Sequence, residues 1–308
     1  MASIVYEAKQ LAEPLLVEVN DGKISTQTYG QYKDRVIKFV IWCRKRYGCR
    51  HAEECPAHLQ DYSDWLVAQG YSPNTVHKYL AGASSVFDVP LESISKPRRV
   101  VANNTRSRGV KAVDSRSDAQ REASPRLYDF ALAVGIRRAE YKHLRGDDLV
   151  IDESGYPCIR VRRGKGGKYQ EQRIAPEDMS FIQSFFDGSH DNVFSSGEMK
   201  NKIDLHHLRA ERAQRAYRDY LARLEADPNY REQLTEEVHR RWNRLCSKRW
   251  NPKRVEGNYY IRDNNRRLAL AHGLPVKYDR LAVMAVSVFH LSHWRCDVTV
   301  ANYLLACT

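Results

Sequence analysis

The first third of the chain shows a helical rhythm of apolar and polar positions. From Thr26 onward the apolar residues recur at steps of three and four, the spacing of one buried helix face: Tyr32, Val36, Phe39, Val40 and Cys43. A second helix is predicted near Pro56. A third is predicted to begin at Pro73, because Ser72 is a typical N-cap residue and proline suits the first helical position. Residues 26–95 are therefore expected to form a small all-α domain, and residues 1–25 a short lead-in.

The apolar periodicity is lost over residues 96–121, and the charge there becomes one-sided. This segment holds two aspartates against eight basic residues: Lys96, Arg98, Arg99, Arg106, Arg108, Lys111, Arg116 and Arg121. Such a composition is typical of an exposed linker. It is either a solvated tether or a segment that lies against a phosphate backbone, and the motifs that follow it favour the second interpretation.

The pattern over residues 122–308 predicts helices mixed with three short strands. Ser124 and Pro125 repeat the helix-start signal, and Gly135 suits the end of that helix. The strands are expected at about 149–151, 158–163 and 170–174, joined by glycine-containing turns. Further helices are expected at 176–186, from His206 to about Leu224, and where the apolar pattern returns at 281–289. The fold class predicted for the chain is mainly α with a small three-stranded antiparallel sheet.

The length and charge of the chain indicate which kinds of partner it can have. A length of 308 residues favours two domains. The chain carries 50 Lys and Arg against 38 Asp and Glu, a net charge of +12 and a pI near 9.3. This excess indicates a polyanionic partner, most commonly nucleic acid, although a basic protein without such a partner has the same composition. No apolar run approaches the roughly eighteen residues of a membrane span, and the N-terminus lacks a signal sequence, so no membrane association is expected.

The number and spacing of the cysteines indicate the cellular compartment of the protein and whether it can hold a metal ion. Seven cysteines, an odd number, favour reduced thiols in a cytoplasm. Cys49, His51, Cys55 and His58 could in principle meet on a metal ion. They contain no C-x-x-C pair and lie in a predicted helix–loop–helix, so ordinary core and surface positions are the favoured interpretation. No metal and no cofactor is expected.

Two basic residues of the C-terminal half are candidates for phosphate chemistry. Arg137 stands in the stretch GIRRAEYKHL near the start of a predicted helix, where free backbone N–H groups favour a phosphate. Lys165 stands at the tip of a glycine-rich hairpin. The hairpin is not a Walker A loop, because Gly166 and not Ser or Thr follows the lysine. Its ordinary interpretation is a plain turn.

A possible nucleophile lies close to the C-terminus. Tyr303 follows His293 by ten residues, and His206 and Arg209 are three apart on one helix face. Each pair alone is more often a buried tyrosine or a surface pair. A tyrosine phenol has a pKa near 10 and attacks a phosphodiester only where cationic and hydrogen-bonding groups stabilise the developing charge.

The order of these features resembles that of the tyrosine recombinases, the integrase family of phages and mobile elements. The matching stretches are GIRRAEYKHL, RGKGGK, HHLR, LSH and the tyrosine in VANYL. The all-α domain, with its SPNTVHKYL, is similar to the family's SAM-like core-binding domain. The fold implied for residues 122–308 is the family's catalytic domain. The resemblance covers the chain from about Thr26 to Leu304.

The resemblance implies six catalytic residues: Arg137, Lys165, His206, Arg209, His293 and Tyr303. The two arginines would clamp the scissile phosphate, since a guanidinium donates two parallel hydrogen bonds and keeps its charge. The histidines would donate to the same oxygens or move the tyrosine proton. The lysine would protonate the leaving 5′ oxygen while the tyrosine becomes joined to the 3′ phosphate. Glu140 would hold the first arginine, and no metal is needed because the arginines supply its charge.

The chain departs from the family pattern at several places. Residues 215–272 form an insertion with no assigned role, and loops accept such additions easily. The hairpin after Lys168 is slightly longer than usual, and Ser292 stands where glycine is usual. Five residues follow Tyr303, whereas family members often pass a C-terminal element to a neighbouring subunit. That docking route is therefore in doubt.

Basic residues outside the catalytic set are candidate DNA contacts. Residues 240–254 hold seven Lys or Arg and no acid, interleaved with Trp242 and Trp250. Together with the linker and the hairpin, they give these candidates: Arg98, Arg99, Arg106, Arg108, Lys168, Arg240, Arg241, Lys248 and Arg249.

The sequence thus predicts a site-specific DNA recombinase, or integrase, in the cytoplasm and associated with the nucleoid. The resemblance implies that the partner is double-stranded DNA with specific recombination sites and that the chain forms a homo-tetramer on paired sites. It also allows an accessory DNA-bending protein as a further partner. Two alternatives are a non-recombining DNA-binding regulator of the same fold and a type IB topoisomerase-like nicking enzyme. A pure binder has no need of Tyr303, and a plasmid relaxation assay would reveal the nicking enzyme.

Overall fold

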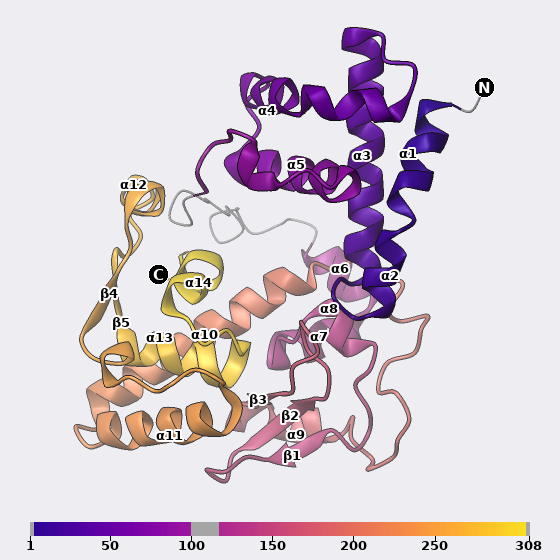
Figure 1. Cartoon of the computed structure of the whole chain (residues 1–308). Helices are drawn as coiled ribbons and strands as arrows, with labels where there is room; N and C mark the ends of the chain where they lie inside the picture. The colour runs from indigo at the N-terminus through magenta and orange to yellow at the C-terminus, as the bar shows by residue number, and fades with distance from the viewer. Residues whose placement is uncertain (1–2, 100–116, 306–308) are drawn as a thin grey trace. The chain divides into compact units, whose positions relative to one another are not determined.

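The chain folds as two compact units, Met1–Val101 and Ala102–Thr308, in the computed structural model (Figure 1). The structure describes residues 3–99 and 117–305. The larger unit contains a three-stranded and a two-stranded antiparallel sheet, and every other described element is helical. This confirms the predicted fold class, mainly α with a small three-stranded antiparallel sheet. No helix in these residues is long and apolar enough to cross a membrane.

The N-terminal unit is built around one long helix. Its elements are α1 (Ile4–Ala12), α2 (Leu15–Asn20), α3 (Thr26–Tyr47), η1 (Ala52–His58), α4 (Leu59–Ala68), α5 (Pro73–Phe87) and η2 (Leu91–Ser93). The predicted stripe of α3 is buried against α4 and α5. Ser72 caps α5 as predicted, and its Oγ accepts from the backbone N–H of Thr75 at 3.3 Å.

The predicted lead-in is wrong, because residues 1–25 contain two helices that belong to this unit. Ile4 and Ala8 of α1 are buried in the same core as α3. Ser3 caps α1 by accepting from the N–H of Tyr6 at 3.2 Å. These helices are short and bury few residues, so their apolar pattern was too brief to indicate a helix face.

The C-terminal unit begins with helices and the three-stranded sheet. Its first elements are α6 (Ser117–Ala123), α7 (Pro125–Val134), α8 (Arg138–Tyr141), β1 (Leu149–Ile151), β2 (Pro157–Val161), β3 (Gln170–Arg173), η5 (Pro176–Asp178) and α9 (Met179–Gln183). The strands pair in the order β1-β2-β3, with Ile159 opposite both Leu149 and Gln172. All three predicted strands are present. Helix α6 occupies the end of the segment predicted as linker.

The second half of this unit is more helical than predicted. Its elements are α10 (Leu205–Ala226), α11 (Tyr230–Leu245), η6 (Pro252–Arg254), β4 (Asn258–Tyr260), α12 (Asp263–Ala271), β5 (Lys277–Asp279), α13 (Arg280–Val286), the π-helical η7 (Ser287–Leu291), α14 (Cys296–Thr299) and the π-helical η8 (Val300–Leu304). The hairpin of β4 and β5 was not predicted.

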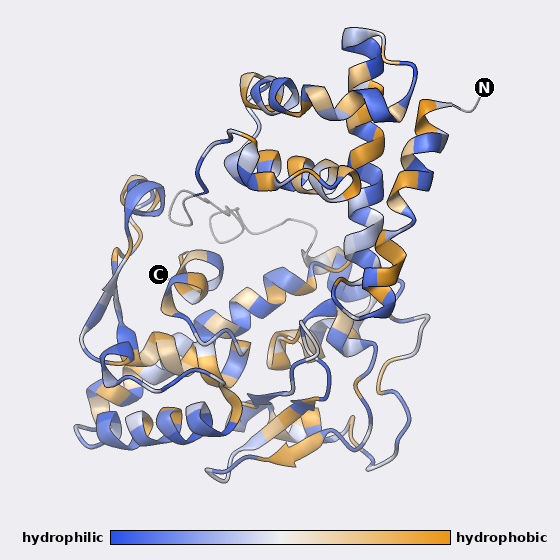
Figure 2. Cartoon of the chain, in the orientation of Figure 1, coloured by the Kyte–Doolittle hydropathy of each residue, from blue (hydrophilic) through white to orange (hydrophobic). Residues whose placement is uncertain are grey.

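Helix α10 joins the two hydrophobic cores of the C-terminal unit. Near its start, Leu205 and Leu208 pack with α7 and the three-stranded sheet. Further along, Ala213 and Tyr217 pack with α11, α13 and η8. In Figure 2 hydrophobic residues are frequent on α13, whereas α11 is largely hydrophilic on its outer side. The start of α10 is therefore fixed by the core that contains the three-stranded sheet, and the rest of the helix by the second core.

Residues 215–272, predicted to be an insertion with no assigned role, contribute helices and buried residues to the C-terminal unit. Leu234, Val238 and Trp242 of α11 are fully buried, and α11 packs against α13. The high charge of this segment suggested exposure. Much of that charge is instead neutralised inside the unit, where Arg241 pairs with Asp152 and Glu153.

Candidate active site

Arg137 lies at the N-cap of α8, immediately after the chain leaves α7 through the left-handed Gly135. Its guanidinium Nη1 donates to Glu140 Oε1 at 2.7 Å, and its backbone N–H donates to Glu140 Oε2 at 2.8 Å. Because the Glu140 side chain is only 2% exposed, one buried carboxylate holds this arginine at two points. With four residues, α8 is too short to act as the predicted helix N-terminal phosphate site. The guanidinium is the group available for a phosphate.

Arg209 lies one turn into α10 and is 1% exposed. Its Nη1 donates to the carbonyl of Gly135 at 2.5 Å, and its Nη2 donates to the carbonyl of Leu291 at 2.7 Å. Within the described residues its Nε has no hydrogen-bond partner. Burial lowers the pKa of Arg209, while Tyr303 opposes this shift and Arg137 adds to it. This buried cation is compensated mainly by neutral carbonyls, so a bound anion would stabilise it.

The carbonyl oxygen of Leu291 brings the two arginines together. It accepts from Arg209 Nη2 at 2.7 Å and from Arg137 Nη2 at 3.4 Å. Leu291 ends η7, and Ser292 follows with φ 51, in the left-handed region that glycine adopts most readily. That conformation accounts for the glycine expected at this position from the resemblance, and it turns the chain toward His293.

Tyr303 is buried between two imidazole rings. Its ring centroid lies 5.3 Å from that of His206 and 5.1 Å from that of His293. The Arg209 guanidinium carbon lies 5.7 Å from the same ring centre. Gln214 of α10 donates to the Tyr303 carbonyl at 3.0 Å, which ties η8 to the helix that carries the histidine–arginine pair.

His293 is neutral at physiological pH. Burial lowers the pKa of His293 to about 2, and the positive charges of Arg209 and Arg137 add to the effect. Its Nδ1 is buried and has no hydrogen-bond partner among the described residues. A neutral imidazole with a free ring nitrogen can accept a proton or a hydrogen bond.

Lys165 is exposed at the tip of the turn between β2 and β3. The turn is closed by hydrogen bonds from Gly164 N–H to the Lys168 carbonyl at 2.7 Å and from Gly167 N–H to the Gly164 carbonyl at 2.9 Å. No contact joins Lys165 to the other site residues, but its charge is among those that lower the pKa of His293. The lysine therefore lies within electrostatic reach of the buried site.

Gln170, at the start of β3, connects this turn to Arg137. Its Oε1 accepts from Arg137 Nη1 at 3.4 Å. Its amide packs so closely on Gly164 that a Cβ there would lie 1.7 Å from Gln170 Nε2. Gln170, Gln214 and the Leu291 carbonyl were all missed from the sequence. Main-chain acceptors carry no sequence signal, and a lone glutamine in a strand suggests no partner.

A cavity of about 330 Å³ opens between the start of α8 and the start of α10. Arg137, Arg138, His206 and Arg209 line it, together with Asp204. The Asp204 carboxylate accepts from the backbone N–H groups of His206 and His207, both at 3.2 Å, and so caps α10. A phosphate in this cavity would lie against guanidinium groups. Tyr303 does not line the cavity, but its ring centroid lies 5.3 Å from that of His206, which does.

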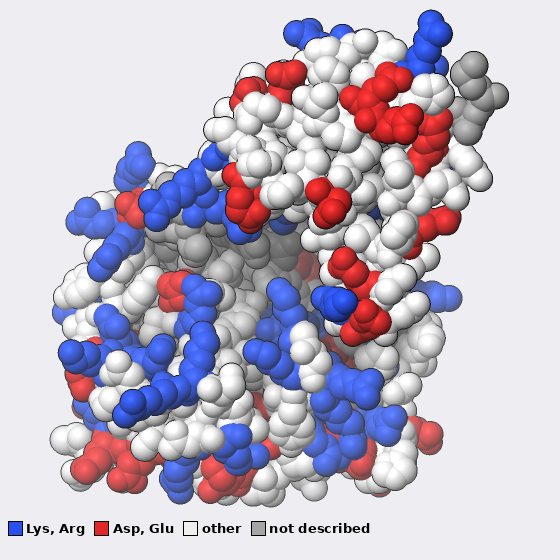
Figure 3. Space-filling view, in the orientation of Figure 1, with Lys and Arg blue, Asp and Glu red and all other residues white. Residues whose placement is uncertain are grey.

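The structure brings five of the six candidate catalytic residues into one cluster, and it leaves Lys165 at the exposed edge. The DNA-contact candidates fall in three groups. Arg106 and Arg108 lie outside the described residues. Those on exposed positions are Arg98, Arg99, Lys168, Arg240, Lys248 and Arg249. In Figure 3 Lys and Arg side chains cover much of the face of the C-terminal unit turned to the viewer.

Arg241 is not a DNA contact, contrary to the prediction. Its side chain is 0% exposed, and its Nη2 lies 2.6 Å from Asp152 Oδ2. Its neighbour Trp242 is also fully buried, so half of the predicted aromatic interleaving faces the core. The basic run in the sequence could not distinguish the buried from the exposed side of α11.

No metal site is present in the described part of the chain, where no three His, Cys, Asp or Glu side chains are arranged to hold an ion. Cys49 and Cys55 are buried in the N-terminal core with Cys43, and the cysteines described are free thiols. His51 Nδ1 lies 3.1 Å from Glu7 Oε1. The four residues weighed as metal ligands thus make ordinary core and surface contacts.

No family model and no curated protein matches the chain. Among solved structures it is similar to the XerA recombinase, with 17% sequence identity over 68% of this chain and 85% of that one, at a TM-score of 0.25. It is also similar to the integrase from mycobacterium phage Brujita, with 18% identity over 68% of this chain and 78% of that one, at a TM-score of 0.24. At TM-scores this low, neither likeness indicates what the chain does. In its motifs and among solved structures, the chain is similar to recombinases and integrases.

Proposed function

We propose that this chain is a site-specific DNA recombinase that cuts and rejoins DNA through a 3′-phosphotyrosine intermediate. The observation that carries the proposal is the cluster around the Leu291 carbonyl. Two guanidinium groups share that acceptor, and the one on Arg209 lies 5.7 Å from the ring of a tyrosine flanked by two imidazoles. A DNA-binding protein without chemistry has no use for a buried phenol among these groups.

In the proposed reaction, the scissile phosphate binds to Arg137 and Arg209. Each guanidinium still has N–H groups that an incoming oxyanion can use, including the unpartnered Arg209 Nε. Charge builds on the non-bridging oxygens as the tyrosine oxygen approaches phosphorus. Donors fixed in place by Glu140 and the Leu291 carbonyl need little reorganisation at that moment.

Proton transfer completes the cleavage step. The Tyr303 hydroxyl loses its proton to an imidazole, and the free Nδ1 of His293 can accept it once the negative charge of the bound phosphate offsets the two arginines that lower the pKa of this histidine. The new bond joins the tyrosine oxygen to phosphorus, and the bond from phosphorus to the 5′ oxygen breaks. Lys165 supplies a proton to that oxygen. The reverse sequence rejoins the strand, so neither a nucleotide nor a net oxidant is consumed.

The proposed partners follow from the family that the motifs resemble. They are double-stranded DNA with paired recombination sites and three further copies of this chain, with an accessory DNA-bending protein at some sites. The proposed location is the cytoplasm, at the nucleoid. Two alternatives compete with recombination, a DNA-binding regulator and a type IB topoisomerase-like nicking enzyme. A regulator would form no covalent adduct, and a nicking enzyme would relax plasmid without paired sites.

The test uses a library of nicked duplexes with random sequence, so that one experiment traps the intermediate and finds the target. Wild-type protein should trap a covalent protein–DNA adduct, and sequencing the trapped strands gives the cleavage site. Tyr303→Phe, which lacks only the hydroxyl, should trap none. An adduct formed by Tyr303→Phe would place the nucleophile elsewhere, and no adduct with wild type would favour the regulator.

A second substrate tests whether Lys165 protonates the leaving 5′ oxygen. When the bridging 5′ oxygen is replaced by sulfur, the leaving thiolate needs no proton. Lys165→Ala should be nearly inactive on the oxygen substrate and recover on the sulfur substrate, while Tyr303→Phe stays inactive on both. A Lys165→Ala variant that is equally slow on both substrates would mean that the lysine positions the phosphate instead of protonating the leaving group.

A further inference from the structure

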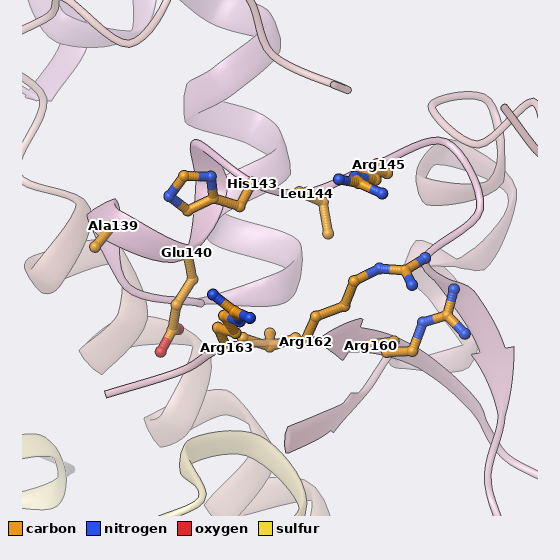
Figure 4. A pocket seen from close by; sticks show the side chains of 9 residues that line it. Ala139, Glu140, His143, Leu144, Arg145, Arg160, Arg162 and Arg163 are labelled. Atoms are coloured by element: carbon orange, nitrogen blue, oxygen red, sulfur yellow. The ribbon is translucent and has the colours of Figure 1, made fainter. Parts of the chain in front are cut away.

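A second, larger basic pocket adjoins the candidate active site. Its volume is about 590 Å³, and it lies between α8 with the segment after it and β2 with the turn after it. In Figure 4 the side chains of His143 and Arg145 lie across the pocket from those of Arg162 and Arg163. The proposed reaction uses none of these side chains, and most of the pocket wall is basic.

Two of the four arginines in the wall are already neutralised. Arg160 Nε donates to Asp148 Oδ1 at 2.8 Å, and Arg162 Nη2 donates to Asp147 Oδ2 at 2.6 Å. Asp147 accepts from both arginines, and its pKa is lowered, chiefly by its hydrogen bond with Arg162. Two carboxylates therefore balance two guanidinium groups, and this part of the wall carries no net charge.

The other two arginines keep their charge. Arg145 and Arg163 are exposed, and neither side chain makes an ion pair or hydrogen bond with any residue in 3–99 or 117–305. The backbone of Arg145 is engaged, since its N–H donates to Asp148 Oδ2 at 2.9 Å and its carbonyl accepts from the Asp148 N–H at 3.0 Å. The nearby carboxylates of Asp147 and Asp148 already pair with Arg160 and Arg162. Two unpaired guanidinium groups that face one pocket favour an anion with several acceptor oxygens.

The pocket and the candidate active site share a wall. Glu140 lines the pocket and also holds Arg137 through its Oε1 at 2.7 Å. The β2–β3 turn continues directly from Arg163 to Lys165, the proposed acid for the leaving oxygen. A polyanion bound at Arg137 and extending past this glutamate would pass the opening of the pocket.

We propose that this pocket binds one further phosphate group, held between Arg145 and Arg163. Resting on the proposed function, the phosphate is assigned to a phosphodiester of the DNA strand next to the scissile one. Its contact would fix the strand on both sides of Glu140, so that the scissile phosphate meets Arg137 in one register. A free nucleotide or inorganic phosphate carries the same chemistry and is distinguished below.

The experiment measures how DNA affinity depends on salt, in a Tyr303→Phe background that prevents cleavage. A generic duplex is sufficient. Loss of one phosphate contact flattens the slope of log K against log salt by about 0.9. The Arg145→Gln/Arg163→Gln double variant should give this flattening, each single variant a smaller one, and Arg163→Lys should retain most of the wild-type slope because it keeps the charge.

Lys142→Gln is the matched control. Lys142 is exposed, sits next to His143 and does not line the pocket, so its replacement removes the same charge from the same region. Its slope should equal that of wild type. Equal flattening by Lys142→Gln would mean that only the general field of this surface matters, and the pocket proposal would be wrong. Unchanged slopes for both arginine variants would also overturn it.

The source of the phosphate is tested without DNA. Inorganic phosphate and adenosine monophosphate are titrated against the full chain, and against the Arg145→Gln/Arg163→Gln double variant, by calorimetry. Millimolar or weaker binding to both proteins supports a strand phosphate. Tight binding that the double variant loses would assign the pocket to a free phosphate ligand and overturn the strand assignment. All these measurements precede chemistry, so they decide the pocket even if no tyrosine adduct forms.

Discussion

Two sets of arginines in the C-terminal unit are mostly buried, with Arg244 the exception at 38% exposure, and their charges are compensated differently. The site arginines, Arg137 and Arg209, have one carboxylate between them, and their other acceptors are carbonyl oxygens and the Gln170 side chain. The network that joins the three-stranded sheet to α11 contrasts with this. It pairs three arginines with four carboxylates: Arg173, Arg241 and Arg244 with Asp152, Glu153, Glu171 and Glu237.

The pKa of an arginine is also shifted in opposite directions in the two sets. Burial lowers the pKa of Arg173, but Tyr220, Asp152 and Glu237 outweigh it, so its pKa is raised. For Arg209 burial prevails and the pKa is lowered. Buried charge is costly unless it is paired, so a fully paired network serves the fold. A buried cation without enough carboxylates can be stabilised by a bound anion, and this agrees with the phosphate-binding role proposed for Arg209.

The largest expected effect is on stability. Arg241→Met removes one of the two guanidinium groups that pair with the buried Asp152, the one at 2.6 Å, and breaking a buried pair typically costs about 3–5 kcal/mol. Urea unfolding of the two proteins measures this. Arg240→Met, on the exposed neighbour, is the control and should stay within about 0.5 kcal/mol of wild type. Equal stabilities for Arg241→Met and wild type would remove the distinction between the two sets.

Arg209→Lys should have the opposite profile. Lysine keeps the charge but loses the planar fork, so covalent adduct formation should slow by roughly 10²–10³-fold, the range for one lost oxyanion donor. DNA affinity should change little. Arg212→Lys, one turn further along α10 and also buried, is the matched control and should form adduct at nearly the wild-type rate. Near-normal adduct formation by Arg209→Lys would remove that arginine from the site.

The neutral histidines beside these arginines predict a pH dependence. The pKa of His293 is lowered to about 2 by burial, and burial also lowers that of His290 well below its ordinary value. The unfolded chain takes up protons at both positions below about pH 6.5, whereas the folded chain does not. Folding stability should therefore be complete above pH 6.5 and fall by about 1.4 kcal/mol per pH unit for each histidine on acidification to pH 5.

Urea unfolding at pH 7, 6 and 5 checks this dependence. His293→Gln should remove about half of the slope between pH 6 and 5, because His290 still contributes. A slope that His293→Gln leaves unchanged would mean that this histidine is protonated in the folded protein, which would exclude it as the acceptor of the tyrosine proton.

The smallest expected effect is on cleavage, when an arginine of the paired network is replaced. Arg244 pairs with Glu171 of β3, and β3 follows directly from the turn that carries Lys165. Partly exposed pairs contribute up to about 1 kcal/mol, so Arg244→Ala should slow cleavage about threefold to fivefold. If it acts by loosening the lysine, the defect should disappear on the 5′-sulfur substrate. An equal defect on both substrates would indicate a general loss of structure, for which Asn243→Ala is the control.

Local signals account for most of the elements that the sequence predicted correctly. Ser72 and Pro73 begin α5, Gly135 ends α7, and glycine-containing turns separate the three strands. Caps, turns and periodicity act over a few residues, so they can be read without knowing the fold. The same reasoning failed for α1, α2 and the β4–β5 hairpin, whose short segments are stabilised by distant parts of their units.

The sequence by itself determined the fold class, most element positions and the set of residues worth considering at the site. Only the tertiary structure decided which of two residues of the same type is exposed and which is buried and paired. Arg240 and Arg241 are adjacent in the chain, yet one is exposed and the other lies fully buried against carboxylates that follow β1, about ninety positions away. Likewise the Leu291 carbonyl meets Arg137 and Arg209 only in the fold. Burial and pairing depend on contacts between distant segments, and those contacts decide whether an arginine is exposed, paired with carboxylates or buried against carbonyl oxygens.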